Sequence, residues 1–587
     1  MFLARDKTRT WTPRLGSTAT AFGSACILCA LLCLGASVPL LRVHADEKKD
    51  HQRKFLELTK KYEAERERVA VERSETILAL AELPIPQAVA FLQKALDAPK
   101  EDEIVRETIL RALAKNGSAS AVQIVLSKGF EILIPRRYVL IGDSLGKVSD
   151  PGALEWITKT GWKQIPQLGP EGQREYLRVL DATGDFRVTT GAAKLVGHPS
   201  LGAESQIGVI ELLRRHRDVG SADKIARLIK FNDPSVRVTV LYALRDLEAA
   251  EHSKVFLDAV EDPDWQVRSA ALDVLRATKD PEMIPYFLTA LGDKAESVQI
   301  SAIQALQELG GDSVMSPLIG ALEKATGRVK DDLAEALVRL TGQDYGVDPL
   351  AWDAWWKANQ GKVTIAKLSI DEYNRAKEKE DQKTTGLYYG LRVISQHVAF
   401  VIDVSGSMEE PYLVEDKEPD VAGGTGRTGV DKKKDGKRKK SRKAKIEVAR
   451  EELISVIGGI KNGTQFNIIK FSGLFTPWQQ QLVAMNEAVR SESMDFVKAL
   501  SPGGETNVFD SLMFALDLKD VNTIYFLSDG APTAGTVTDS KQILEKVAEA
   551  NRVKKVKLYT IGFHLTPEAE ELMQNLAEQN YGRFVKR

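Results

Sequence analysis

Five residues in the last third of the chain carry oxygen atoms of the kind that bind a hard metal ion. Asp403, Ser405 and Ser407 directly follow one apolar run. Thr506 lies in the Gly-rich segment PGGETN, and Asp529 follows a later apolar run. Hydroxyl and carboxylate oxygens suit Mg²⁺, which takes an octahedral oxygen shell and keeps several waters in it. No His or Cys stands among the five, which argues against Zn²⁺ and redox metals. The set therefore favours Mg²⁺, and the alternative is that these side chains only cap turns and helices.

The segments around these residues alternate between strand and helix patterns. Four apolar runs of strand length are separated by helical segments such as KIEVAREELISVI, and they read HVAFVIDVSGSM, TQFNIIKFSG, VNTIYFLSDG and VKKVKLYTIGFH. Nearly continuous apolar strands alternating with helices predict a parallel sheet that is covered on both faces. Ligands bind outside the carboxyl ends of the strands in such sheets, and the polar residues named above fall there.

This arrangement resembles the von Willebrand factor A domain and its metal-ion-dependent adhesion site. The family motif is D-x-S-x-S after the first strand, a Thr in a Gly-rich loop and an Asp after the fourth strand. Carried over by position, Asp403, Ser405 and Ser407 supply the first element, Thr506 the second and Asp529 the third. The resemblance covers about 396–587 and implies a doubly wound, Rossmann-like α/β fold. It also implies a protein ligand whose acidic residue completes the metal shell.

The middle of the chain is periodic. Leucines recur every 31 residues, at Leu213, Leu244, Leu275, Leu306 and Leu337. A Val near the start of each helical pattern recurs at the same interval, at Val236, Val267, Val298 and Val329. A fixed period of this size is typical of a solenoid of helix pairs, in which neighbouring pairs bury one continuous core. The copies DPSVRVTVLYAL and DPDWQVRSAALDVL resemble HEAT repeats of the short kind found in bacteria. HEAT arrays imply protein binding rather than catalysis.

The first 45 residues read as an export signal. Basic residues precede the apolar stretch ACILCALLCLGASVPLL, and Val-His-Ala follows it, which predicts cleavage after Ala45. The alternative is an uncleaved anchor helix, because the uncharged run from Leu15 to Leu41 is long enough to span a bilayer. All three cysteines lie in this stretch, so the cleaved chain would hold no disulfide or thiolate site. We expect an exported protein of the periplasm, the cell surface or the medium.

The remaining segments complete the expected domain plan. An insertion at 409–444 is first acidic, then Gly-rich, then basic, and we expect it to be disordered. Trp352, Trp355 and Trp356 recur at helical spacing and predict a helix that caps the last repeat. The expected plan is a signal peptide at 1–45, a charged helical lead-in at 46–73, an all-α HEAT-like solenoid at 74–345, a Trp-rich cap and charged linker at 346–395, and the α/β domain at 396–587.

The composition excludes some classes of function. The 587 residues are 43% apolar and 28% charged with a net charge of −1, so the chain has no overall electrostatic field that would attract nucleic acid. We expect a non-enzymatic binding or scaffold protein, with no small-molecule substrate and with the solenoid as a second interaction surface. The alternative is a HEAT-repeat lyase or hydrolase that uses the α/β domain for targeting. Gly142-Asp143-Ser144-Leu145-Gly146 fits the G-x-S-x-G pattern, but its flanks continue the helical repeats instead of forming a strand.

Overall fold

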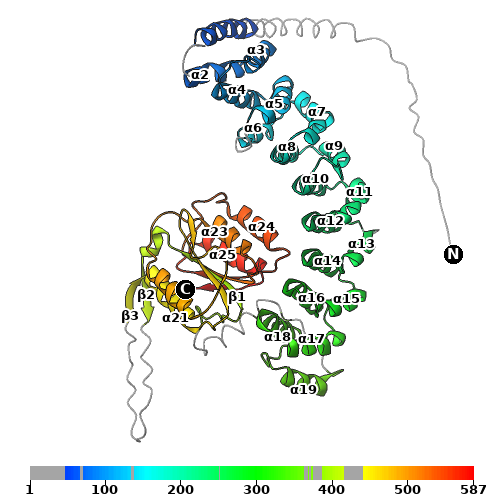
Figure 1. The fold of residues 1–587 in the computed structure, drawn as a ribbon, viewed down its shortest axis with the longest axis vertical. Helices are drawn as coiled ribbons and strands as arrows, with labels where there is room; N and C mark the ends of the chain where they lie inside the picture. Colours follow the sequence, from blue (N-terminus) through cyan, green and yellow to red (C-terminus); the bar gives the residue numbers. More distant parts are fainter. Residues whose placement is uncertain are drawn as a thin grey trace, which may run out of the picture. The chain divides into compact units, whose positions relative to one another are not determined.

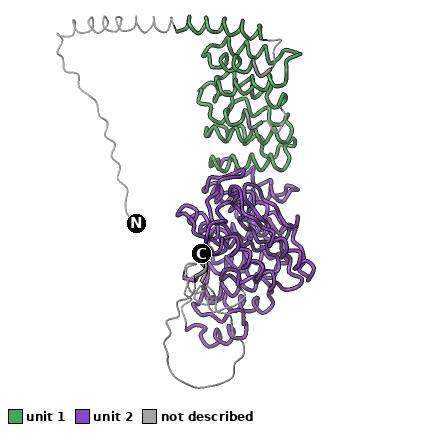
Figure 2. Tube along the Cα trace, turned by 90° about the vertical axis from the view of Figure 1, so that its left-hand side faces the viewer, with its two compact units in different colours: residues 1–218 green, residues 219–587 purple. Residues whose placement is uncertain are grey.

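The fold is taken from a computed structural model of the full chain. The chain divides into two compact units, residues 1–218 and residues 219–587 (Figure 2). The expected export signal at 1–45 lies outside the described residues, and none of the described helices is both long and apolar enough to cross a membrane. The described residues are 47–65, 70–133, 138–249, 252–362, 368, 372–373, 387–415 and 440–587.

The first unit is built from helices. Residues 47–64 form a helix, and a series of antiparallel helices follows (Figure 1). The local sequence determines where these helices begin. The Asp102 carboxylate caps one helix by accepting a hydrogen bond from the N–H of Ile104 (2.8 Å), and Pro151 is the first residue of another helix, directly after Asp150. The helices are α2 (Ala70–Ala81), α3 (Pro86–Leu96), α4 (Glu103–Asn116), α5 (Ala119–Ile132), α6 (Val139–Leu145), α7 (Pro151–Lys159), α8 (Pro170–Ala182), α9 (Val188–Leu195) and α10 (Ala203–Arg215), with the 3₁₀ helix η2 (Gly161–Gln167).

The second unit begins with further helix pairs, which are stacked in chain order (Figure 1). The leucines spaced 31 residues apart lie on every second helix and are buried there, which confirms that the period marks core positions. The helices are α11 (Ala222–Arg227), α12 (Pro234–Asp246), α13 (Ser253–Ala259), α14 (Trp265–Ala277), α15 (Ile284–Ala290), α16 (Glu296–Leu309), α17 (Asp312–Lys324), α18 (Gly327–Thr341) and α19 (Pro349–Asn359), with the 3₁₀ helices η3 (Val219–Ser221), η4 (Leu228–Lys230) and η6 (Pro281–Met283).

A repeated ion pair joins successive repeats of this unit. The Arg268 guanidinium donates two 2.8 Å hydrogen bonds to the Asp293 carboxylate of the next loop. It also donates to the carbonyl of Asp262 at 2.9 Å. One repeat earlier, Arg237 binds the carboxylate of Asp262 in the same two-pronged way, at 2.9 and 2.8 Å. Such paired contacts are short and charge-assisted, so the arginine after the repeated Val holds the spacing of neighbouring repeats.

The tryptophan-rich segment forms α19, which packs on α17. Trp352 and Trp356 are buried, and the Trp356 indole N–H donates to the Ser316 hydroxyl of α17 at 3.1 Å. The Trp352 indole N–H donates to the carbonyl of Gly346 at 2.9 Å. Two large aromatic side chains with satisfied N–H groups therefore cover this end of the helical stack.

The rest of the second unit is a sheet with helices on both faces. Its strand order is β5-β4-β1-β7-β8-β9, with β6 beside β4, and β4, β1, β7, β8 and β9 run parallel. The two faces alternate along β1: Phe400 joins one core with Leu453 of α21, and Val401 joins the other with Leu512 of α23 and Leu572 of α25. These elements are β1 (His397–Asp403), η7 (Gly406–Glu409), α21 (Lys445–Gly459), β4 (Gln465–Phe471), β5 (Phe475–Pro477), β6 (Val483–Ala484), α22 (Glu487–Lys498), α23 (Val508–Asp517), β7 (Thr523–Ser528), α24 (Ser540–Asn551), β8 (Lys557–Gly562), α25 (Pro567–Gln579) and β9 (Phe584–Lys586).

The insertion after the first strand departs from the expectation of disorder at both of its ends. There, β2 (Pro411–Glu415) and β3 (Lys440–Ala444) pair as an antiparallel ladder, and 416–439 lie outside the described residues. The Tyr412 ring packs edge-on against Phe563, with ring centroids 5.1 Å apart. A paired backbone and an aromatic anchor give these ends order that their charge-rich composition does not suggest.

Within the second unit, the amino-terminal edge of the sheet is bound to the helical repeats. Lys557 begins β8, and its ammonium donates to Asp332 of α18 at 2.7 Å and to Glu335 at 3.3 Å. Lys555, two residues earlier, donates to Asp273 of α14 at 2.6 Å. The Arg328 guanidinium, also on α18, donates to the carbonyl that precedes β7 at 2.6 Å. The repeats and the sheet are therefore joined by buried, charged contacts.

Candidate metal centre

The end of β1 and the end of β7 bring the first acidic residue into a buried position. The two strands are parallel neighbours, so Asp403 at the end of β1 lies beside Ser528 at the end of β7. The Ser528 hydroxyl donates to Asp403 Oδ2 at 2.6 Å, and the N–H of Ser405 donates to Asp403 Oδ1 at 2.7 Å. Asp403 is fully buried. Its carboxylate is thus held by neutral donors at the carboxyl edge of the sheet.

The two serines of the motif lie next to each other and reach the second acidic residue. The hydroxyls of Ser405 and Ser407 are 3.1 Å apart. The Ser407 hydroxyl donates to Asp529 Oδ1 at 2.7 Å, which joins the loop after β1 to the loop after β7. The turn of η7 produces this geometry, because it folds the chain back directly after the strand. Four of the five predicted residues therefore form one hydrogen-bonded group.

Thr506 reaches the same group from the Gly-rich loop. Gly503 and Gly504 have φ values of 155° and 87°, and this turn brings the loop against the strand end. The N–H of Gly406 donates to the carbonyl of Gly504 at 3.0 Å. A side chain at Gly530 would lie 3.7 Å from Thr506 Oγ1 and 3.9 Å from the Ser407 hydroxyl. The structure therefore places all five predicted residues around one point at the carboxyl edge of the sheet.

Burial and charge set the electrostatics of this group. Burial raises the pKa of Asp403 to about 6, and the negative charge of Asp529 adds to the shift, while the hydrogen bonds from Ser528 and Ser405 oppose it. Asp529 has a cationic partner, because the Lys445 ammonium donates to Asp529 Oδ2 at 2.9 Å. The charge of Asp403 is thus one that a bound cation would balance.

The donor set fits a hard divalent ion. Three neutral hydroxyls and two carboxylates provide oxygen ligands without nitrogen or sulfur, which suits Mg²⁺. No three His, Cys, Asp or Glu side chains cluster as a metal site anywhere in the described part of the chain. A site here would therefore depend on the hydroxyls as much as on the carboxylates.

Three residues of this site escaped the sequence reasoning. Ser528 holds Asp403, and the Thr533 hydroxyl accepts a hydrogen bond from the N–H of Thr506 at 2.8 Å. Lys445 is the third, and it reaches Asp529 from the start of α21. Its position was readable, since it opens the amphipathic helix that follows the insertion. In the sequence, however, it looks like the last residue of a basic run.

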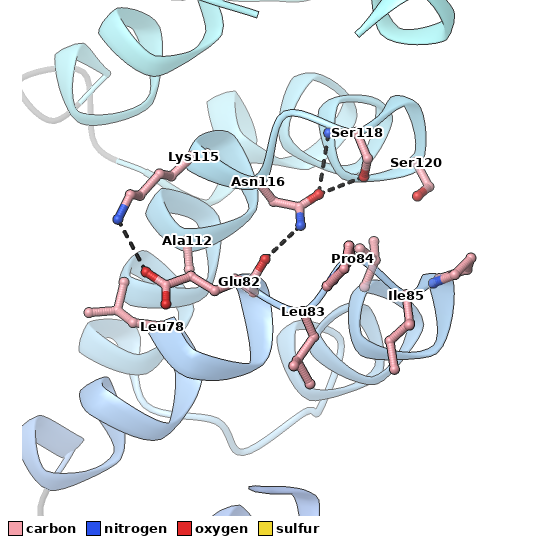
Figure 3. Close-up of a pocket in the computed structure, with 13 residues that line it drawn as sticks. Leu78, Glu82, Leu83, Pro84, Ile85, Ala112, Lys115, Asn116, Ser118 and Ser120 are labelled. Carbon is pink, nitrogen blue, oxygen red and sulfur yellow. Dashed lines mark hydrogen bonds and ion pairs between the residues drawn. The ribbon is translucent and has the colours of Figure 1, made fainter. Parts of the chain in front are cut away.

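Two other features of the chain show no comparable chemistry. Ser144 lies inside helix α6, as its helical flanks predict, so the G-x-S-x-G pattern there lacks the strand-to-helix turn of a nucleophile. A mainly apolar cavity of about 440 Å³ lies between α2, α3 and α4 (Figure 3). Its Asn116 donates to the carbonyl of Ala81 at 2.6 Å and accepts from the Ser118 hydroxyl at 2.6 Å. These polar groups join the loop between α4 and α5 to the end of α2, so they serve the fold.

Comparison with known proteins matches both halves of the fold. A sequence profile for HEAT repeats matches residues 253–338, and one for the von Willebrand factor type A domain matches residues 439–585. The human von Willebrand factor A domain-containing protein 3B is 27% identical over 146 residues, which are 24% of this chain and 11% of that protein. Inter-alpha-trypsin inhibitor heavy chain H1 of Mesocricetus auratus is 26% identical over 185 residues, which are 30% of this chain and 16% of that protein.

A solved structure described as von Willebrand factor type A from Catenulispora acidiphila aligns with a TM-score of 0.24 and 15% identity, over 32% of this chain and 38% of that one. This chain spans well under two thirds of the length of all three proteins. The buried 31-residue period, the doubly wound parallel sheet and the two profile matches lead to one conclusion. The chain contains HEAT repeats followed by a von Willebrand factor type A domain.

Proposed function

We propose that this chain is a non-enzymatic binding protein whose von Willebrand factor type A domain captures a protein ligand through Mg²⁺. The observation that supports it most directly is the convergence of Ser405, Ser407 and Thr506 with two buried carboxylates at one sheet edge. The matching profile and the similar human protein are both described by their von Willebrand factor type A domain, which supports a role in protein interaction.

Each residue has a distinct role in this proposal. Ser405, Ser407 and Thr506 would hold Mg²⁺ through their hydroxyls, and Asp403 and Asp529 would act through bound water and through the hydrogen bonds that orient the serines. With few direct carboxylates, the ion would stay electrophilic and accept an acidic side chain of the ligand. That contact would anchor the interface, and the surrounding loops would set specificity.

The geometry of the second unit also favours a scaffold role for its repeats. Their contacts with the sheet domain involve the residues at the starts of β7 and β8, whereas the proposed metal site lies at the ends of β1 and β7. In parallel strands these are opposite edges of the sheet. The repeats therefore hold the domain while leaving the metal edge to a ligand. We assign the solenoid's further role, as a second interaction surface, to the helices that do not contact the sheet.

A matched pair of variants at Thr506 tests the metal-dependent function. Thr506→Ala removes one proposed ligand and should abolish Mg²⁺ binding in calorimetry, together with EDTA-sensitive capture of partners from whole cells. Thr506→Ser keeps the hydroxyl and should retain both. Thr476→Ala, at an exposed position on β5 of the same domain, is the control for general effects of a lost hydroxyl. Full partner binding in EDTA by a folded protein would refute the role of the site.

We also propose that the protein is exported. The basic start, the apolar stretch and the Val-His-Ala end support a signal that is removed after Ala45. Terminal sequencing of the cellular protein should then find Asp46 as the first residue. Retention of Met1 in a membrane fraction would instead support the anchor interpretation.

A further inference from the structure

A buried lysine lies against the proposed metal site. The Lys445 ammonium donates to Asp529 Oδ2 at 2.9 Å and to Glu410 Oε2 at 2.7 Å, and its side chain is only 2% exposed. Its backbone is fixed as well, because the N–H of Lys445 donates to the carbonyl of Glu410 at 3.0 Å. The lysine is therefore held at both ends, with its charge directed into the site.

The local structure gives no reason for a lysine at this position. Lys445 is the first residue of α21, where the helix dipole disfavours a positive charge. Its burial is a further cost for an ammonium group. The start of this helix is served by another residue, since Glu447 accepts a hydrogen bond from the N–H of Ala444 at 3.3 Å. The contacts with Asp529 and Glu410 therefore account for the lysine.

Asp529 is shared between the proposed ligands and this ammonium. Its Oδ1 accepts from the Ser407 hydroxyl, while its Oδ2 accepts from Lys445. A divalent cation that approaches the site would meet a carboxylate whose charge is already balanced, and it would be repelled by the ammonium. We propose that Lys445 is a built-in competitor of the cation, which weakens the affinity of the site and keeps Asp529 paired when no metal is bound. This inference rests on the proposed metal function.

Glu410 completes this arrangement as a second acceptor. Its side chain is 64% exposed, in contrast to the buried Asp529 carboxylate, and it is bound to the same ammonium. When a cation displaces the Lys445 ammonium from Asp529, the ammonium keeps Glu410 as a partner. It is therefore not left buried and unpaired. Removal of the Glu410 charge should therefore tie Lys445 more closely to Asp529 and weaken cation binding.

Calorimetric titration of the full chain with Mg²⁺ alone tests the proposal. Lys445→Met removes the competing charge and should tighten Mg²⁺ binding by about tenfold or more. Lys443→Met removes a nearby lysine that pairs with Glu451 at the surface, and it should leave the affinity unchanged. If Lys445→Met fails to fold without metal, Lys445→Gln is used, because it retains an N–H donor for Asp529. A folded Lys445 variant with equal or weaker affinity would overturn the proposal.

Two further arms separate the possible explanations. Glu410→Gln should weaken Mg²⁺ binding severalfold in the natural sequence and have no further effect beside Lys445→Met. A loss of affinity in both backgrounds would make Glu410 a ligand of the metal and would overturn its role through the lysine. If the natural chain binds Mg²⁺ and Lys445→Met binds it equally, only this inference fails. If neither the natural chain nor any variant binds Mg²⁺, the proposed function fails with it.

Discussion

Replacing Lys557 should weaken the attachment of the von Willebrand factor type A domain to the HEAT repeats. Its ammonium is almost fully buried at the start of β8, where it donates to Asp332 at 2.7 Å and to Glu335 at 3.3 Å. Lys557→Met keeps most of the side-chain volume and removes the charge. Two carboxylates of α18 would then lose their partner inside the interface.

The expected cost follows from what remains around those carboxylates. Removing one partner of a buried ion pair costs about 3–5 kcal/mol, mainly because the other charge stays buried. Asp332 keeps the Arg328 guanidinium, whose Nε lies 3.2 Å from its carboxylate, and Glu335 is partly exposed and can be hydrated. Both facts reduce the cost, so we expect a loss of about 3 kcal/mol in the free energy of unfolding.

Urea unfolding of the full chain, followed by circular dichroism and by tryptophan fluorescence, measures this loss. Lys557→Met/Asp332→Asn should recover only part of it, because it removes the unpaired Asp332 charge but also takes the carboxylate partner from the buried Arg328 guanidinium. Lys498→Met is the matched control, since that lysine forms an exposed pair with Asp495 and should cost less than about 0.5 kcal/mol. A change below about 1 kcal/mol in Lys557→Met would refute the view that this ion pair holds the two domains together.

The remaining predictions concern the pH dependence of stability and the arginine–aspartate pairs that join successive repeats. Burial opposes ionisation of Lys557 and Asp332, but their mutual attraction raises the pKa of Lys557 well above its usual value and lowers that of Asp332. A raised lysine pKa loses its stabilising effect only as pH rises above about 10, and a lowered aspartate pKa only as pH falls below about 4. Unfolding experiments should therefore find this pair's contribution constant from about pH 5 to about pH 9. Arg268→Ala should cost about 2–4 kcal/mol, because the half-buried Asp293 carboxylate loses its cationic donor and keeps only a backbone N–H donor, and two loop carbonyls lose the guanidinium. Hydrogen exchange should speed up in the adjoining helices first.

The repeats could be predicted from the sequence because their stabilising contacts recur at the same interval as the residues. Leu244 and Leu275 stand 31 residues apart and occupy equivalent buried positions on α12 and α14. Arg237 and Arg268 keep that interval too, and each binds the aspartate of the following loop. A contact that is made in every repeat requires the same residue type at a fixed interval, and this interval can be detected in the sequence.

The grouping of the five candidate residues could be predicted for a different reason. Its residues are far apart in the chain, but parallel strands bring their carboxyl ends to one edge, so strand order alone collects them. Asp403 binds Ser405 and Asp529 binds Ser407, and the hydroxyls of these two serines are 3.1 Å apart, because β1 and β7 are neighbours. What the strand pattern could not supply was the direction of individual side chains, such as that of Lys445, whose contacts depend on the path of the insertion.

The contact between the repeats and the sheet was outside the reach of sequence reasoning. Lys555 and Lys557 alternate with apolar residues in a run that reads as an ordinary strand start, and Asp273 and Asp332 look like the polar positions of amphipathic helices. Only the folded chain shows that these charges face each other, at 2.6 and 2.7 Å. A pair of complementary charges on two separate elements leaves no periodic trace, because each member alone suits a solvated surface.

The polarity of the parallel sheet would allow one small domain to be held firmly and still be available for the binding that we propose. β7 and β8 have six residues each, so the first and the last residue of a strand are about 17 Å apart. Their starts carry the contacts to the repeats, while the end of β7 carries Ser528 and is followed by Asp529. Contacts at the edge where the strands start can be as extensive and as charged as stability requires without involving the edge where the strands end. An antiparallel sheet would place strand starts and ends at both edges and would mix the two tasks. The parallel sheet separates them, which is why we expect Lys557→Met to change stability while leaving Mg²⁺ affinity at the other edge unaltered.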